Sequence, residues 1–429
     1  MNQRAAILAQ DRAHVWHPYT QMQEYVEQTE PLVLDSARGS RLYDVDGRSY
    51  IDANASWYCC TLGHQHPRLV QALTAQAAKM CHVALAGIAH EPAAALAGEL
   101  CAVAPSGLSR VFYSDDGSTA VEVALKLALQ YWAQNGRPER TRFLALDGAY
   151  HGDTMAASSV SGIDVFRRPF GGVLLDCLRV PPGATGYAQA FEVLGRLLAE
   201  HADQLAAVIV EPIAQAVAGM RFYAPEFLRA LRDLCTKHDV FLICDEVFTG
   251  YGRTGPFWAC AHAGISPDIL CLAKGFTAGM LPMAATLANE RIFAGFLGAA
   301  ERTFFYGHTF CGNPLGAALA REVLSVFKDE DVLGVAAGNA ARIAQAFESF
   351  RALPGVVETR SLGMIGALDL AGSKSYLETR GRRVCAEARR RGAYMRPLGN
   401  TIYITPSLNI PTADLDELLG IVEESVRVG

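Results

Sequence analysis

Lys274 is the side chain whose setting first suggests chemistry. It follows the apolar run Ile-Leu-Cys-Leu-Ala and precedes Gly-Phe-Thr, whereas the other lysines stand in polar or helical-surface stretches. A buried ammonium is costly, and burial favours the neutral amine that can form a Schiff base with a carbonyl. A lysine that reaches solvent from the end of a strand would give the same pattern, so Lys274 alone leaves both interpretations open.

Two acidic residues end apolar runs in the same way. Glu211 follows Leu-Ala-Ala-Val-Ile-Val, and Asp245 follows Val-Phe-Leu-Ile-Cys. Because ligands bind at the carboxyl ends of strands in open α/β sheets, we expect Glu211, Asp245 and Lys274 to share one edge of a sheet. A carboxylate there can keep the ring nitrogen of pyridoxal 5'-phosphate (PLP) protonated, which makes the ring an electron sink. A charged strand end without a ligand is the alternative for any one of the three.

A third feature is the pair Gly117-Ser118, which precedes a helical stretch that begins near Thr119. We expect Ser118 to be the N-cap, and the free N–H groups of the first turn to form an anion site suited to a phosphate. Asp115 and Asp116 should weaken this site through charge repulsion. A capped helix without a ligand is the alternative.

Tyr150 and His151 follow the apolar run at 142–146. Tyr150 can stack on a flat ring, and His151 could be a metal ligand. No histidine spacing typical of zinc sites and no His-Glu-x-x-His segment occurs, so we predict no metal site. The glycine patterns of dinucleotide and P-loop sites and the Gly-x-Ser-x-Gly of serine hydrolases are also absent.

Alternating strands and helices must position these residues. Apolar runs at 142–148, 205–212, 240–247 and 268–274 are expected strands, and the stretches 66–80, 118–136 and 225–239 have helical spacing. Buried strands separated by helices predict an α/β fold with a mostly parallel central sheet and helices on both faces.

Three parts of the chain are expected. Residues 1–64 should contribute to a small domain and to the active site. Within them, residues 1–60 look irregular apart from a hairpin around Asp46-Gly47, a strong turn pair. Residues 65–315 form the large domain, and residues 316–429 form a smaller α+β domain with further helices and strands.

Composition excludes several function classes. The net charge is -6, and the short basic run at 389–391 reads as a solvated helix face, so a nucleic-acid binder is not expected. The eleven cysteines are scattered and form no Cys-x-x-Cys pair, which favours a reducing compartment. No signal-peptide core and no long apolar run of the membrane-spanning kind is present, so we expect a cytoplasmic protein.

The segment at 241–255, Phe-Leu-Ile-Cys-Asp-Glu-Val-Phe-Thr-Gly-Tyr-Gly-Arg-Thr-Gly, is followed by Lys274, 29 residues after Asp245. This segment resembles the signature of class III PLP-dependent aminotransferases, as do the stretches at 112–128, 147–154, 209–213 and 306–315. The resemblance covers nearly the whole chain. It implies PLP-dependent transferase fold type I and a homodimer with active sites at the subunit interface.

The resemblance also implies roles for single residues. Lys274 would bind PLP covalently and move a proton, Asp245 would pair with the ring nitrogen, and Val247 and Tyr150 would lie against the two ring faces. The other implied cofactor residues are Gly117, Ser118, Glu211 and Thr309 of the partner subunit, and the implied substrate residues are Tyr19, Trp57, Tyr58, Arg253, Gly307 and Arg396.

Within the family, four segments are the most informative. The stretches at 14–22, 55–58, 131–136 and 396–406 resemble members that make 7,8-diaminononanoate for biotin synthesis. This implies transfer of an amine from S-adenosylmethionine to 8-amino-7-oxononanoate, with Arg396 binding the acceptor's carboxylate. Lysine as donor, another class III ω-aminotransferase activity and a PLP-binding regulator are the alternatives.

Some residues depart from the family pattern. Asp116 stands at the phosphate turn where serine is usual, Tyr306 and His308 flank Gly307, and Cys59-Cys60 replace apolar residues. All of them are expected near the cavity or the phosphate, where they bear on the choice of amino donor.

Overall fold

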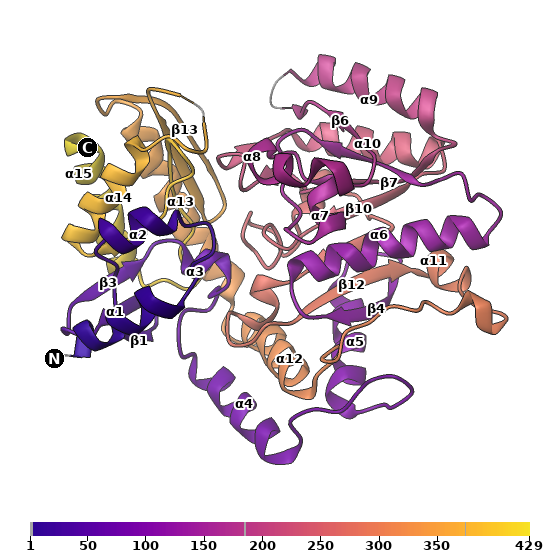
Figure 1. The fold of residues 1–429 in the computed structure, drawn as a ribbon, viewed down its shortest axis with the longest axis horizontal. Coiled ribbons are helices and arrows are strands. Elements are labelled where there is room, and N and C mark those ends of the chain that lie inside the picture. The colour runs from indigo at the N-terminus through magenta and orange to yellow at the C-terminus, as the bar shows by residue number, and fades with distance from the viewer. Residues whose placement is uncertain (1–2, 184–185, 374) are drawn as a thin grey trace.

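A computed structural model describes residues 3–183, 186–373 and 375–429 of the chain. The N-terminal elements lie against the C-terminal elements on one side of the molecule, and a large sheet with its helices lies on the other (Figure 1). Within the described residues, no helix is both long and apolar enough to cross a membrane.

The large sheet has seven strands, and six of them run in the same direction. β12 is the exception, since it pairs antiparallel with both of its neighbours. The α/β fold with a mostly parallel sheet is therefore confirmed, and three of its strands, β4, β6 and β12, were not predicted. In spatial order the strands are β4 (Leu108–Ser114), β12 (Ala284–Asn289), β11 (Ile269–Leu272), β10 (Phe241–Asp245), β7 (Leu205–Val210), β5 (Arg142–Leu146) and β6 (Cys177–Val180).

Helices cover both faces of this sheet (Figure 1). In β10, Phe241 and Ile243 belong to the core cluster that contains α6 (Gly117–Gln134), whereas Leu242 and Cys244 belong to the cluster that contains α9 and α10. Successive strand residues point to opposite faces, so a strand buried on both faces must be apolar throughout. The covering helices of the second face include α9 (Tyr187–His201), α10 (Pro225–Lys237), α5 (Glu91–Val103) and α12 (Pro314–Asp329).

The two ends of the chain meet in a small sheet. The expected hairpin is present: β2 (Arg41–Asp44) and β3 (Ser49–Asp52) pair antiparallel, and Gly47 has a φ of 82° in the turn between them. β3 also pairs in parallel with β15 (Ala393–Tyr394) from the C-terminal region. β1 (Leu34–Arg38) completes the sheet on the other side of β2.

The expectation of irregular structure before the hairpin was wrong. α1 (Gln3–His14) is a helix with no buried residue, and it is rich in Ala, Gln and Arg, which form helices well without packing. The other described elements are α2 (Met22–Glu27), α3 (Ala55–Tyr58), α4 (Pro67–Lys79), α7 (Met155–Val160), α8 (Asp164–Arg167), β8 (Ala214–Gln215), β9 (Arg221–Phe222), α11 (Glu290–Ala294), α13 (Val332–Phe350), β13 (Val356–Leu362), β14 (Ile365–Leu370), α14 (Arg380–Arg391), β16 (Thr401–Ile404) and α15 (Thr412–Val428). The division of the chain after residues 64 and 315 remains a prediction.

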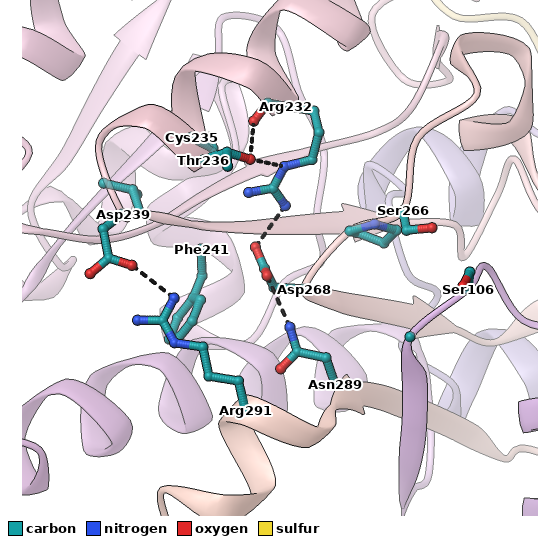
Figure 2. A pocket seen from close by; sticks show the side chains of 13 residues that line it. Ser106, Arg232, Cys235, Thr236, Asp239, Phe241, Ser266, Asp268, Asn289 and Arg291 are labelled. Atoms are coloured by element: carbon teal, nitrogen blue, oxygen red, sulfur yellow. Dashed lines mark hydrogen bonds and ion pairs between the residues drawn. The ribbon is translucent and has the colours of Figure 1, made fainter.

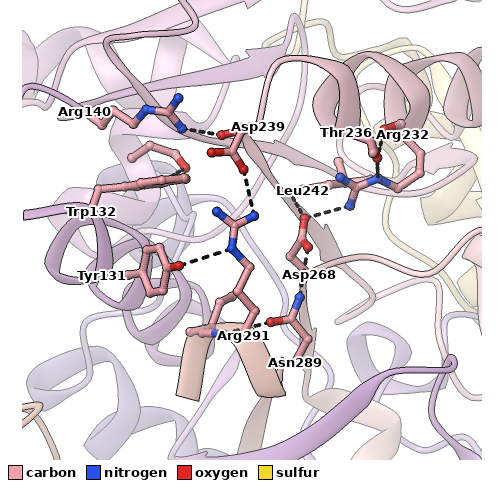
Figure 3. A network of polar contacts seen from close by, with 12 residues as sticks. Tyr131, Trp132, Arg140, Arg232, Thr236, Asp239, Leu242, Asp268, Asn289 and Arg291 are labelled. Carbon is pink, nitrogen blue, oxygen red and sulfur yellow. Dashed lines mark hydrogen bonds and ion pairs between the residues drawn. The ribbon is translucent and has the colours of Figure 1, made fainter. Parts of the chain in front are cut away.

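Paired charges close the edge of the sheet where β10 and β11 begin. Asp268 accepts hydrogen bonds from Arg232 Nη1 at 2.7 Å, from Asn289 Nδ2 at 3.0 Å and from the Leu242 N–H at 2.8 Å (Figures 2 and 3). Arg291 pairs with Asp239 at 2.7 Å in the same cavity of about 360 Å³. Because these charges pair with one another, we assign this edge a structural role, in which ion pairs join helices to the starts of the strands.

Candidate active site

The opposite edge of the sheet opens into a second cavity of about 680 Å³. Glu211 lies just after β7, Asp245 ends β10, and Lys274 follows β11, so the three strand ends meet there as their positions predict. The other predicted residues that line this cavity are Tyr19, Trp57, Tyr58, Gly117, Ser118, Tyr150, Val247 and Arg396.

Lys274 presents an amine without an acidic partner. Its side chain is half-buried, its Nζ lies 5.3 Å from the centre of the Tyr58 ring, and no carboxylate in the described parts of the chain pairs with it. Its φ of 50° is in the left-handed region, which costs a residue other than glycine roughly 1 kcal/mol or more and is found most often at functional sites. Lys274 is thus a strained, unpaired lysine inside the cavity.

Asp245 is held by a histidine. Nδ1 of His151 lies 2.7 Å from Oδ2 of Asp245, and both residues are buried. The other carboxylate oxygen accepts a hydrogen bond from the Val247 N–H at 3.1 Å. The suggested use of His151 as a metal ligand finds no support, since no group of three or more potential ligands is arranged around a metal position in the described residues.

The start of α6 differs from the prediction in its cap. Asp116, and not Ser118, is the N-cap: its Oδ1 accepts from the Thr119 N–H at 2.9 Å, and Thr119 Oγ1 accepts from the Asp116 N–H at 2.9 Å. Aspartate caps a helix as well as serine does, and the helix therefore begins two residues earlier, at Gly117. The Ser118 hydroxyl instead accepts from the Asp153 N–H at 3.2 Å.

The carboxylates before α6 are both engaged. Asp116 is used by the cap, and Asp115 lies 2.8 Å from Nδ1 of His308, whose Nε2 is 3.0 Å from the Tyr306 hydroxyl. The departures from the family pattern at 306 and 308 thus form one chain of contacts with Asp115. This chain gives Asp115 a basic partner beside the expected phosphate position.

Tyr150 belongs to a cluster of hydroxyls around Asp153. The Tyr150 hydroxyl donates to Oδ2 of Asp153 at 2.7 Å and lies 2.9 Å from the Tyr19 hydroxyl, which also contacts Asp153. Burial and the contact with Asp153 raise the pKa of both tyrosines, so both remain protonated. Glu211 holds the main chain of Tyr150 in place, since its carboxylate accepts a hydrogen bond from the Tyr150 N–H at 2.9 Å. Burial raises the pKa of Glu211 to about 7.

Aromatic side chains and one arginine form the far wall. Trp57 and Tyr58 lie in a turn whose residues 55–58 all have positive φ, and the Arg396 guanidinium lies 5.1 Å from the Trp57 ring centre. No carboxylate in residues 3–183, 186–373 and 375–429 pairs with Arg396. The wall therefore offers an unpaired cation beside an apolar surface.

Three predicted residues do not line the cavity. Arg253 is buried behind it, where its Nη1 donates to the Pro406 carbonyl at 2.7 Å, and burial lowers the pKa of its guanidinium. Gly307 and Thr309 lie outside the cavity of their own chain. The roles assigned to these three residues remain predictions.

The sequence analysis missed several cavity residues, among them four with side chains that bear on the site. Asp153 stands in the segment at 147–154 that carries the resemblance, and His151 was considered only as a metal ligand. Phe166 and Tyr376 belong to no motif and reach the cavity only through the tertiary fold, where their rings lie 5.0 Å apart.

The residues present fit PLP. An unpaired amine, a buried carboxylate, the N-terminus of an 18-residue helix and an aromatic ring line one cavity. The cradle is tight as well, because a Cβ on Gly117 would lie 2.7 Å from Cγ1 of Val247. Lys274 would hold the aldehyde carbon, Asp245 the ring nitrogen, and the first turn of α6 the phosphate.

Comparisons with known proteins agree with this geometry. Residues 22–426 match the family described as Aminotransferase class-III. A curated relative from Geobacter sulfurreducens, adenosylmethionine-8-amino-7-oxononanoate aminotransferase, is 40% identical over 97% of this chain and 96% of its own length. The crystal structure of the enzyme of that name from Methanocaldococcus jannaschii has a TM-score of 0.96 and 33% identity, with 100% of both chains covered. An amine transaminase from an uncultivated Pseudomonas species, solved in its PLP-bound form, has a TM-score of 0.90 and 32% identity, with 96% of this chain and 98% of that chain covered.

Proposed function

The chain belongs to the class III aminotransferases, whose cofactor is PLP, and we propose that it transfers an amino group to 8-amino-7-oxononanoate, yielding 7,8-diaminononanoate for biotin synthesis. The relatives at 40% and 33% identity carry that activity in their names. S-adenosylmethionine is the proposed donor, because those names include it. Lysine as donor and another long-chain amine or amino acid as substrate remain the alternatives.

The proposed roles follow from what each side chain can do in place. Bound in the cavity, PLP supplies a carbonyl that accepts an amine and a ring that withdraws electrons. Lys274 would hold the cofactor through its amine, and the same amine is the base that would move a proton next to the ring. Asp245, kept in position by His151, would hold a proton on the ring nitrogen.

Binding and exclusion of water fall to the residues around these groups. Gly117 and Ser118 offer main-chain N–H groups to the phosphate. Val247 packs close to Gly117 and is proposed to lie against one ring face, with Tyr150 on the other. Glu211 fixes the main chain of Tyr150.

The unpaired Arg396 beside Trp57 is the observation that carries the choice of acceptor. A guanidinium can bind both oxygens of a carboxylate, and the apolar chain of the acceptor suits a slot lined by Tyr19, Trp57 and Tyr58. Arg253 holds the Pro406 carbonyl behind this wall, so its proposed contribution to substrate binding is to support the wall.

Arg396→Ala tests the acceptor. If Arg396 binds the carboxylate, the variant should raise the KM for 8-amino-7-oxononanoate by roughly tenfold or more, as expected for loss of a charge-assisted pair of about 1.5–3 kcal/mol, while kcat changes less. The KM for a long-chain amino ketone without a carboxylate should not change. An unaffected KM for the keto acid would remove Arg396 from this role.

The donor is tested by single-turnover mixing of the holoenzyme with S-adenosylmethionine, lysine, alanine and putrescine. The true donor should discharge the visible absorbance of the bound cofactor within one turnover. If only lysine reacts, lysine is the donor, and the proposed acceptor is unaffected by this result. Reaction with none of the four would contradict the proposed activity.

We also propose a homodimer in which Thr309 of the partner subunit reaches the phosphate. Two exposed aromatic side chains flank this position, Phe305 at 82% and Phe310 at 57% exposure, and apolar side chains so exposed favour burial against another chain. A monomeric mass in solution would contradict this proposal.

A further inference from the structure

Cys60 lines the cavity, and a histidine and an aspartate that take no part in the proposed reaction lie behind it. The Sγ atom of Cys60 lies 3.7 Å from Nδ1 of His64, and Nε2 of His64 lies 2.9 Å from Oδ2 of Asp52. The carboxylate keeps a proton on Nε2, so Nδ1 faces the sulfur as a proton acceptor. This arrangement activates a cysteine as a nucleophile.

The main chain fixes the distance between Cys60 and His64. The Gly63 N–H donates to the Cys60 carbonyl at 3.1 Å, and His64 exchanges two main-chain hydrogen bonds with Gly39, at 2.8 and 2.9 Å. Gly63 has a φ of 74°, and a Cβ there would lie 2.9 Å from the Gly39 carbonyl oxygen. The turn therefore tolerates only glycine at 63, and it presents the imidazole to the sulfur.

Burial and charge oppose each other at His64, and charge prevails. The Asp52 side chain is 2% exposed and that of His64 is 16% exposed, and the Ser56 hydroxyl donates to the same carboxylate oxygen at 2.8 Å. Burial lowers the pKa of His64, but the hydrogen bonds to Asp52 and Cys60 and their charges outweigh it and raise this pKa to about 10. The imidazole therefore holds a proton readily, which suits a group that takes the thiol proton as the sulfur reacts.

We propose that Cys60 is a reactive thiol, served by His64 and Asp52, which small soft electrophiles and hydrogen peroxide modify selectively. With iodoacetamide, the sulfur–carbon bond forms as the carbon–iodine bond breaks, iodide leaves, and His64 keeps the thiol proton. With peroxide, a sulfur–oxygen bond forms as the oxygen–oxygen bond breaks. The sulfur is oxidised to a sulfenic acid, and the departing hydroxide takes the proton from His64 to become water.

Modification of Cys60 would interfere with the proposed reaction. Cys60 lines the cavity next to Gly279, where a Cβ would lie only 2.7 Å from the sulfur. An added group has no room towards Gly279, so it must project into the cavity. Labelling of Cys60 should therefore inhibit the enzyme.

Cys59 is a matched control in the same chain. It lines the same cavity and is more exposed than Cys60, but its sulfur contacts the Trp57 carbonyl instead of a histidine. Burial raises the pKa of its thiol, although the charge of Lys274 opposes this. If exposure decided reactivity, Cys59 would react faster.

The test is the labelling rate of each cysteine in the holoenzyme treated with iodoacetamide at pH 7, followed by peptide mass spectrometry. An ordinary thiol with a pKa of about 8.5 is roughly 3% thiolate at that pH. A thiol with a pKa near the ambient pH gains about 15-fold in thiolate, and its weaker nucleophilicity reduces the net gain to about threefold. Because burial raises the thiol pKa of Cys59, we expect Cys60 to react at least about threefold faster than Cys59, and equal or slower labelling of Cys60 would overturn the proposal without any variant.

Two variants sharpen the assignment. His64→Gln should slow Cys60 to the rate of Cys59, and an unchanged rate would show that the imidazole does not activate the sulfur. Inactivation by hydrogen peroxide, measured against the untreated activity of each variant, should be lost in Cys60→Ala and kept in Cys59→Ala. The reverse order would assign the sensitivity to Cys59 and contradict the proposal.

Discussion

Replacing His151 by alanine should damage catalysis through Asp245 without touching the substrate. The imidazole lies 2.7 Å from the carboxylate in a region where both side chains are at most 5% exposed, so water cannot easily replace it. A hydrogen bond to a charged group contributes about 1.5–3 kcal/mol, and since about 1.4 kcal/mol corresponds to a factor of ten in rate, we expect kcat to fall roughly 10- to 150-fold. The KM values of both substrates should change much less.

Steady-state kinetics at saturating PLP measure this effect, with two further variants as controls. His151→Gln keeps an N–H donor and should recover part of kcat. Ser161→Ala removes only the hydroxyl that accepts from the His151 main-chain N–H at 2.9 Å, and it should leave kcat within about twofold, since it leaves the charged hydrogen bond intact. If His151→Ala retains the kcat of the natural protein, or if the loss falls on KM, the histidine does not act through Asp245.

Three further predictions concern stability. Asp268→Ala leaves Arg232 without its partner and should cost about 3 kcal/mol, seen as a lower urea midpoint with an unchanged slope. Gly117→Ala places a Cβ against Val247 and should cost about 1–3 kcal/mol, which Val247→Ala should partly restore in the same urea assay. Because burial raises the pKa of Glu211 from 4.5 to about 7, the folded chain retains a proton that the unfolded chain releases. The resulting stability is present below pH 4.5 and lost as the pH rises through 7, so Glu211→Gln should flatten this part of the pH profile of unfolding. The explanation for Asp268 would be contradicted if an alanine variant of an exposed residue shifted the urea midpoint equally. That for Gly117 would be contradicted if Val247→Ala restored no stability. That for Glu211 would be contradicted if Glu211→Gln left the pH profile of unfolding unchanged.

The parts of the sheet that were predicted are those with the simplest burial. β7 and β10 are buried at every position, so each is apolar throughout and visible in the sequence. β4 and β6 are edge strands with exposed or half-buried residues, and their mixed composition resembles that of loops. The antiparallel β12 follows a long irregular stretch, where a helix–strand alternation gives no guidance.

The site, like the sheet, has a part that the sequence predicts and a part that it does not. Glu211, Asp245 and Lys274 could be placed together because each ends an apolar run, and the carboxyl ends of parallel strands meet at one edge. The contacts between His151 and Asp245 and between His308 and Asp115 join residues 94 and 193 positions apart, and no local pattern predicts them. The prediction of the N-cap of α6 was wrong for a different reason. Asp116 and Ser118 are equally good N-cap residues by type, and only the main-chain geometry decides between them.

The parallel pairing of β3 with β15 has a consequence for synthesis of the chain. Asn54, just after β3, accepts from the Arg396 N–H at 2.9 Å and donates to the Tyr403 carbonyl at 3.2 Å, so the turn that carries Trp57 and Tyr58 rests on residues near the C-terminus. Domains emerge from the ribosome N-terminal end first. The wall with Trp57 and Tyr58 must therefore wait for almost the whole chain, whereas the strand ends carrying Glu211, Asp245 and Lys274 are already available. A ribosome-bound chain halted before residue 393 should have the cofactor side of the cavity and lack its substrate side.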